Sequence, residues 1–219
     1  MIIDHIGIAN ENVVFRMIGR LAFPLFAYQM AIGMKHTQNI QRHALKLLLF
    51  ATICQIPYIV FMKMCKITPD LNILFTFTIS NLLILVLDYF KIISRNKEST
   101  ITFNWKNILI ATPLVALLLF LAVYINVDYG IYGILLPIFF LCTFDNKVLT
   151  SCGFFAMLIA HYYFNPKYIT LFGILSVFDL IFILNYNGKK CYKNGIIFYI
   201  IYFLQFPLLI AFKYWLLNN

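Results

Sequence analysis

Long apolar runs recur along nearly the whole chain and are separated only by short polar breaks. Apolar residues make up 63% of the 219 residues and charged residues only 11%, whereas soluble domains carry about 45–50% and about 25%. The runs are longer than the roughly ten-residue alternating strands of a membrane barrel, so they predict helices with internally satisfied backbones. The sequence therefore predicts an all-α, polytopic integral membrane helical bundle with the lipid bilayer as its solvent.

The polar breaks divide the chain into about eight or nine spans, which we expect to form a single domain over residues 1–219. A span needs about 20 apolar residues. The N-terminal stretch Met1 to Ile8 is too short to cross, so it either lies at the surface or ends a first helix that is truncated here. The other expected spans are Leu21 to Met34, His43 to Met64, Leu71 to Ile93, Asn107 to Asn126, Tyr129 to Phe144, Val148 to Phe164, Tyr168 to Tyr186 and Gly195 to Leu217.

The net charge of +9 reflects topology, because the lysines and arginines gather in the short breaks. When the loops are assigned alternately to two sides, eleven of the 17 basic residues fall on one side. This bias favours a multi-pass plasma-membrane protein with loops 35–46, 91–106, 145–147 and 187–194 in the cytoplasm and the C-terminus outside. No nucleic-acid partner is indicated. The five cysteines lack CxxC spacing, so we expect neither a metal site nor a disulfide framework.

Ionisable residues near the N-terminus are the first candidates for chemistry. An ionised group at membrane depth costs about 2.5–3.5 kcal/mol on insertion scales, so such groups usually face a partner. Asp4 and Arg20 are the pair that we would test first. A carboxylate beside an imidazole can fix its tautomer and raise its basicity, which would make His5 a general base. The alternative is an interfacial Asp-His pair that only ends a helix.

A proline lies inside the first long apolar run. Pro24 removes one backbone hydrogen bond and predicts a bend there, with carbonyl groups left free to line a site. An ordinary kink is the alternative, since proline is frequent in membrane helices.

A polar loop with several hydrogen-bond donors follows this run. It contains Lys35, His36 and Arg42, and basic side chains at the membrane face suit the phosphates of a donor such as acetyl-CoA. The same residues also fit a simple topology signal.

Single polar residues occur deeper in the chain, at Asn81, Asp88, His161 and Asp179. Such residues more often pack helices or contact water than catalyse, yet a carboxylate in a span needs a proton or a cation. In a transporter, a second class of protein, Asp88, His161 and Asp179 would be the intramembrane carriers. Transporters often show a repeat of broken helices, and none is evident in the sequence.

An ordered set of motifs resembles the TraX family of multi-span membrane acetyltransferases, named for the enzyme that acetylates F-pilin. The resemblance covers nearly the whole chain, although residues 80 to 125 match only in hydropathy. The motifs are Met1 to Gly7, Arg16, Gly19 to Tyr28, Gly33, His36-Thr37, Arg42, Gln55 to Tyr58, Asn72 with Phe75-Thr76, Asp128 to Gly130, Asn187 to Lys189 and Phe198-Tyr199.

This resemblance implies a transmembrane acyltransferase bundle that moves acetyl from cytosolic acetyl-CoA to an amine or hydroxyl. His5 would be the base or acetyl carrier, with Asp4 as its orienter. The residues implied in donor binding are Arg20, Lys35, His36, Arg42 and Asn72. The acceptor stays open between a peptide N-terminus, a glycan and a small amine, and a homo-oligomer is also left open.

The chain departs from the family pattern near its C-terminus. Relatives tend to carry a histidine in the segment that matches Tyr202 to Phe206, and here Gln205 can hydrogen-bond but cannot take up a proton. A non-catalytic membrane remnant is a third alternative, because the first helix is expected to be truncated at the N-terminus.

Overall fold

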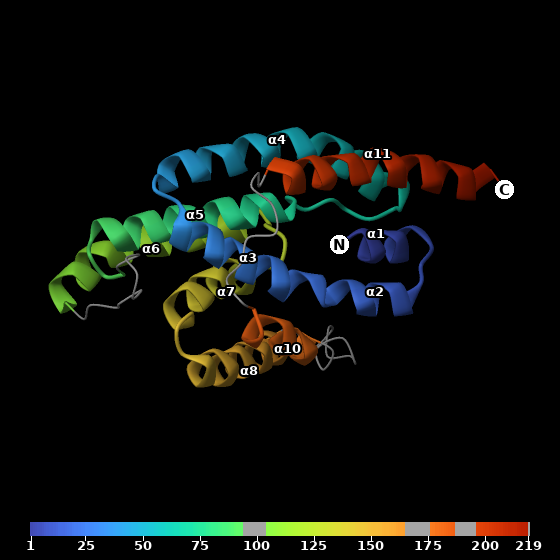
Figure 1. Ribbon diagram of the computed structural model, residues 1–219. Helices are drawn as coiled ribbons and strands as arrows, with labels where there is room; N and C mark the ends of the chain where they lie inside the picture. The colour runs from blue at the N-terminus through green and yellow to red at the C-terminus, as the bar shows by residue number, and fades with distance from the viewer. Residues whose placement is uncertain (94–103, 165–175, 187–195, 219) are drawn as a thin grey trace. The chain divides into compact units, whose positions relative to one another are not determined.

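The computed structural model describes residues 1–93, 104–164, 176–186 and 196–218, and within these ranges every regular element is a helix (Figure 1). The predicted all-α class is thus confirmed. The elements are α1 (Ile2–Ala9), α2 (Val13–Arg20), α3 (Ala22–His36), α4 (Ile40–Met64), α5 (Ile73–Tyr89), α6 (Trp105–Tyr124), α7 (Gly130–Thr143), α8 (Lys147–Phe164), the 3₁₀ turn η2 (Ser176–Phe178), α10 (Asp179–Leu184) and α11 (Ile196–Asn218).

Four helical stretches in the described part of the chain are long and apolar enough to cross a membrane. They are Val13–His36, Ile40–Met64, Trp105–Tyr124 and Ile197–Asn218, and α5 and α7 are shorter apolar helices. The first stretch begins before the expected Leu21 because α2 continues into α3. The described residues do not include the start of the expected span Tyr168 to Tyr186, most of the loop 91–106, the whole loop 187–194, or Cys191.

The junction of α2 and α3 falls where the sequence predicts a bend. Pro24 has no N–H, so the carbonyl of Arg20 cannot receive the usual helical hydrogen bond. Helix α2 ends at Arg20 and α3 begins at Ala22. Between them, the N–H of Leu21 donates to the carbonyl of Ile18 at 3.3 Å, which tightens the last turn of α2.

The chain divides into two compact units, and each is described by itself. Unit 1 comprises residues 1–25, 52–69 and 162–219, and unit 2 comprises residues 26–51 and 70–161. Unit 1 thus contains α1, α2, α10 and α11, and unit 2 contains most of α3 together with α5, α6 and α7.

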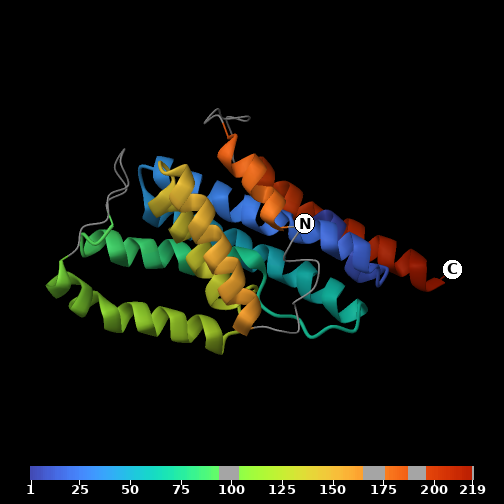
Figure 2. The same ribbon diagram turned by 90° about the horizontal axis from the view of Figure 1, so that it is seen from below.

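Small and polar residues hold α5 against α7 in unit 2, where α5, α6 and α7 contact one another (Figures 1 and 2). The Thr76 hydroxyl donates to the Asp128 carbonyl at 2.8 Å, and the Ser80 hydroxyl donates to the Ile134 carbonyl at 2.9 Å. A Cβ on Gly133 would lie 2.8 Å from the Thr76 methyl group. The glycine therefore permits the close approach that interhelical hydrogen bonds need.

Helix α6 exposes most of its apolar side chains. Trp105, Leu109 and Phe120 are 62%, 66% and 66% exposed, and the buried residues of the helix are Ala111 and Ala122. A contiguous apolar face of this kind is stable against lipid and unfavourable against water. The burial pattern of α6 thus agrees with the candidate span.

Candidate functional site

Helix α1 packs closely against α2 in unit 1 through glycines. A Cβ on Gly19 would overlap the Cα and Cβ atoms of Asp4, and a Cβ on Gly7 would lie 2.8 Å from the backbone nitrogen of Arg16. Each glycine removes the atom that would otherwise separate the two helices. As a result, Asp4 lies against the end of α2 that carries Arg16 and Arg20.

Burial and the neighbouring arginines have opposite effects on the pKa of the Asp4 carboxyl. Helix α1 is too short to cross a membrane and lies outside the four candidate spans. Burial raises the pKa of the Asp4 carboxyl above its usual value, and the guanidinium groups of Arg20 and Arg16 partly offset this rise. Both arginines thus influence the Asp4 carboxyl within unit 1, and the pairing of Asp4 with Arg20 stays a prediction.

The His5 imidazole is enclosed by aromatic side chains and is only 7% exposed. Its ring meets those of Tyr58, Phe61 and Phe206 edge to face, with centroid distances of 6.5, 5.8 and 5.2 Å. Burial lowers the pKa of His5 to about 3. The imidazole is therefore neutral at physiological pH, and its Nδ1 has no hydrogen-bond partner among the described residues.

Asp4 and His5 point in different directions, although they are neighbours in the sequence. Successive residues of an α-helix do not face each other, so Asp4 faces α2 while His5 faces the aromatic residues. Oδ1 of Asp4 and Nδ1 of His5 are both without a hydrogen-bond partner in the described part of the chain. No hydrogen bond by which Asp4 would orient the imidazole is present among these residues.

Helix α11 contributes the other polar groups around α1. Lys213 Nζ donates to the carbonyl of Ala9 at 2.7 Å, at the end of α1. Gln205 is 4% exposed, and its Nε2 has no partner among the described residues. It directly precedes Phe206, which contacts His5. Gln205 thus lies on the helix that covers His5.

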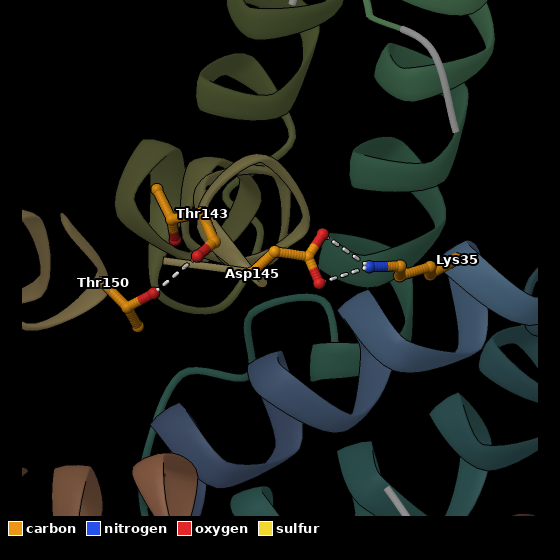
Figure 3. A network of polar contacts seen from close by, with 4 residues as sticks. All are labelled: Lys35, Thr143, Asp145 and Thr150. Atoms are coloured by element: carbon orange, nitrogen blue, oxygen red, sulfur yellow. Dashed lines mark hydrogen bonds and ion pairs between the residues drawn. The ribbon is translucent and has the colours of Figure 1, made fainter. Parts of the chain in front are cut away.

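The predicted donor-binding residues Lys35, His36, Arg42 and Asn72 all belong to unit 2. Figure 3 shows that the Lys35 ammonium is already paired: its Nζ lies 3.1 and 3.0 Å from the two carboxylate oxygens of Asp145. It also lies 4.2 Å from the centroid of the Phe144 ring. Asp145 stands in the turn between α7 and α8, where the Thr150 hydroxyl donates to the Thr143 carbonyl at 2.8 Å.

His36 and Arg42 are exposed at the connection between α3 and α4. Asn39 begins α4 by accepting the backbone N–H of Arg42 at 2.9 Å, so His36 and Arg42 flank a defined turn. Asn72 is different, because it is fully buried. Its oxygen caps α5 at Leu74 N, and its nitrogen donates to the Ala51 carbonyl at 2.8 Å.

One pair of polar residues was not predicted from the sequence. Asn81 Nδ2 lies 2.9 Å from His43 Nδ1 and joins α5 to α4 in unit 2. The two residues are 38 positions apart, and no local pattern relates them. Asn81 alone was noted as a polar residue amid apolar neighbours.

The other isolated polar residues show no common arrangement. Asp179 is fully buried at the start of α10, and neither carboxylate oxygen has a partner among the described residues. His161 stacks on Tyr132 with a centroid distance of 4.3 Å. Within the described part of the chain, no group of three His, Cys, Asp or Glu residues could hold a metal ion.

The fold and these buried ionisable groups define a class, that of helical proteins with candidate membrane spans. A model of the TraX protein family matches residues 1–213, so the chain belongs to that family. No curated protein and no solved structure matches the chain.

Proposed function

We propose that this protein is a membrane-embedded acetyltransferase that moves acetyl from cytosolic acetyl-CoA to an acceptor amine or hydroxyl. The observation that carries the proposal is the TraX family match over residues 1–213, because this family is associated with the acetylation of F-pilin. The acceptor is a peptide N-terminus, a glycan or a small amine. The protein would be a plasma-membrane bundle of eight or nine spans, of the transmembrane acyltransferase type.

In the proposed reaction, the acceptor nitrogen or oxygen attacks the thioester carbon. The new bond to acetyl forms, the carbon–sulfur bond breaks, and the acceptor proton leaves while the CoA sulfur departs with the bonding electrons. His5 is the proposed proton acceptor. Its buried imidazole, whose Nδ1 has no partner among the described residues, supports this role.

The roles proposed for the other residues follow from their positions within each unit. Asp4, with Arg20 and Arg16 nearby, would position α1 and so His5. The exposed His36 and Arg42 would meet the CoA phosphates, and Lys35 would join them when its pairing with Asp145 is released.

Asn72 is proposed to support the donor site indirectly. Its side chain is fully buried and bonded to α4 and α5, so it would position α5 without touching the donor.

The test uses the purified full chain with radiolabelled acetyl-CoA and peptides that carry a free N-terminal amine. His5→Ala is expected to lower the transfer rate by at least 100-fold, the typical contribution of a general base being about 10²–10⁴. His161→Ala is the matched control, since this histidine stacks on Tyr132 within unit 2 and has no role in the proposed reaction. Transfer by His5→Ala at the wild-type rate would remove His5 from the mechanism.

Transport of a small solute is the second candidate, and one observation favours it. Asp179 is fully buried without a partner for either oxygen among the described residues, a state that suits a carrier of a proton or cation. Solute flux into proteoliposomes that is independent of acetyl-CoA and is lost in Asp179→Asn would promote this candidate over the enzyme.

A further inference from the structure

The direction of the His5 imidazole is set by packing, because no side chain forms a hydrogen bond with its Nδ1. The outer torsion of a histidine side chain is broad, and functional histidines are commonly oriented by a hydrogen bond at one ring nitrogen. Here Nδ1 has no hydrogen-bond partner among the described residues. Asp4, which was expected to orient the ring, lies against α2. Other side chains of unit 1 must therefore hold the imidazole.

Three aromatic rings stand around the imidazole at steep angles. The ring planes of Tyr58, Phe61 and Phe206 are inclined to it by 76°, 89° and 65°. Because none of them lies flat on the imidazole, rotation about the outer torsion of His5 would bring its edge against a neighbouring ring. The rings come from two helices. Tyr58 and Phe61 are about one turn apart on α4, and Phe206 belongs to α11.

Phe206 connects the rings of this cluster. It is fully buried, and its centroid lies nearer to the imidazole than those of Tyr58 and Phe61. It also lies 5.5 Å from Tyr58, 6.4 Å from Phe61 and 5.3 Å from Tyr202. Phe206 thus contacts His5 and also both of the other rings that surround it.

Helix α11 holds Phe206 against α1 at more than one level. Lys213, seven residues after Phe206, donates to the carbonyl of Ala9, four residues after His5. Both contacts advance in the same direction along the two helices, so α11 runs beside α1 here. Helix α11 has 23 residues and α1 only eight, and a helix of eight residues is marginal by itself. The longer helix therefore supplies the fixed wall against which the imidazole rests.

We propose that Phe206 is the positioning residue that orients the imidazole of His5 for proton transfer, a role that we expected of Asp4 from the sequence. This inference rests on the proposed function and adds a residue to its site. The hydrocarbon ring takes no part in the transfer itself, but it holds the proton-accepting nitrogen in one direction. Such positioning matters because a displacement of about 1 Å can cost a factor of about 10² in rate.

The first test examines His5 without any reaction. Diethyl pyrocarbonate acylates accessible neutral imidazoles, and mass spectrometry gives the modification rate of each histidine in the purified full chain. Phe206→Leu keeps an apolar side chain but removes the ring, so the imidazole is less confined. The modification rate of His5 is expected to rise several-fold, while the exposed His36 serves as the internal reference.

Phe154→Leu is the matched control. Phe154 is as fully buried as Phe206, and it packs on Phe140 with a centroid distance of 5.7 Å within unit 2. Both leucine variants lose a buried ring and should unfold at similarly lowered temperatures. Only Phe206→Leu should change the modification rate of His5, and Phe206→Tyr, which keeps the ring, should restore most of the wild-type rate.

The second test separates kcat from KM in the acetyl-transfer assay. Phe206→Leu should lower kcat by about tenfold or more. The KM for acetyl-CoA should stay near the wild type, since the proposed donor-binding residues His36 and Arg42 belong to unit 2. Phe206→Tyr should recover most of the lost rate, and Phe154→Leu should transfer acetyl like the wild type. A loss confined to KM would contradict a positioning role.

The failures of the two proposals can be told apart. An unchanged modification rate of His5 in Phe206→Leu would overturn the inference, and so would an equal rise in Phe154→Leu. Faster modification together with a wild-type kcat would overturn it too, because a misdirected base must slow the transfer. Modification of His5 that depends on Phe206, in a protein without acetyl transfer, would support the orienting contact and contradict the acetyltransferase.

Discussion

At the scale of single residues, the burial of His5 makes stability depend on pH. Its pKa is about 3 in the folded chain and 6.5 when exposed. Between pH 6.5 and pH 3, His5 binds a proton in the unfolded chain but not in the folded chain. The free energy of unfolding therefore falls as the pH drops through this range, by at most about 1.4 kcal/mol per pH unit.

The measurement is thermal unfolding in detergent between pH 7 and pH 4. His5→Phe keeps an aromatic ring in the cluster and should lose less stability on acidification than the wild type. His36→Phe, a change at an exposed histidine, should keep the wild-type acid sensitivity. If His5→Phe and wild type respond alike, His5 does not titrate in this way.

A second residue-scale prediction concerns Gly19. Gly19→Ala would force its methyl group onto the Cα and Cβ atoms of Asp4, so α1 must shift away from α2. Overpacking of this kind costs about 1–3 kcal/mol, more than the helix propensity gained from alanine. A lower unfolding temperature is expected, whereas Gly33→Ala, whose methyl group meets only His43 at 3.7 Å or more, should unfold near the wild-type temperature.

Asp145 competes with the donor for Lys35 if the proposed function holds. Asp145→Asn removes the carboxylate that lies 3.0 Å from the Lys35 ammonium. The ammonium can then bind a phosphate group of the donor. Because the Asp145 side chain is 56% exposed, the pair is worth about 0.2–1 kcal/mol, and coenzyme A should bind up to about fivefold more tightly.

Equilibrium binding of coenzyme A checks this prediction. Asp145→Glu keeps the competing charge and serves as the control, with affinity close to the wild type. Weaker binding in Asp145→Asn would mean that the pair holds the site together and does not block it.

At the scale of elements, α1 depends on its neighbours because an eight-residue helix is marginal by itself in water. Lys213 donates to the Ala9 carbonyl at 2.7 Å, where a cation also interacts favourably with the helix C-terminus. Lys213→Met should therefore destabilise α1 locally, by about 1–2 kcal/mol. Hydrogen exchange of the α1 amides should speed up accordingly.

The control for Lys213 is Lys63→Met, which removes an exposed lysine near the end of α4 in the same unit. Lys213→Arg should retain most of the protection of α1. Unchanged exchange in Lys213→Met would show that the glycine contacts with α2 alone hold the helix.

The positions of helices could be predicted from the sequence where the local composition of the chain determines them. The apolar runs located α4, α6 and α11, and Pro24 located the break between α2 and α3. The run before Leu21 was not assigned to a span, although α2 and α3 together form the helical stretch Val13–His36, which is long enough to cross.

Contacts between helices were less predictable, because they depend on register and side-chain direction. The motifs brought Asp4 and His5 together in sequence, but the helix turns them toward different neighbours. His43 and Asn81 meet only because α4 and α5 pack antiparallel. The prediction of a single domain stays a prediction, since the two compact units are described separately.

At the scale of the whole molecule, hydrogen bonds in unit 2 group the loops into two ends. Lys35 at the end of α3 pairs with Asp145 between α7 and α8, so these two connections lie at one end. Leu71 bridges to Val127, which places the segments before α5 and α7 together as well. The loops near residues 35–46 and 145–147, assigned to one side from charge alone, are thus also joined in space.

The orientation of the chain can be tested at the two ends of α4. With 25 residues at about 1.5 Å each, this helix exceeds a hydrocarbon core of about 30 Å, so its ends should lie on opposite sides of the membrane. Single cysteines at Gln38 and Thr68, both exposed, would be placed in a variant with the five native cysteines replaced by serine. In sealed inside-out vesicles, an impermeant maleimide should label Gln38→Cys and spare Thr68→Cys, because the charge bias predicts that the basic loop 35–46 faces the cytoplasm. The reverse pattern would mean that the topology is inverted, so that Lys35, His36 and Arg42 would not face the compartment that holds acetyl-CoA. Labelling of both positions would mean that α4 does not cross the membrane.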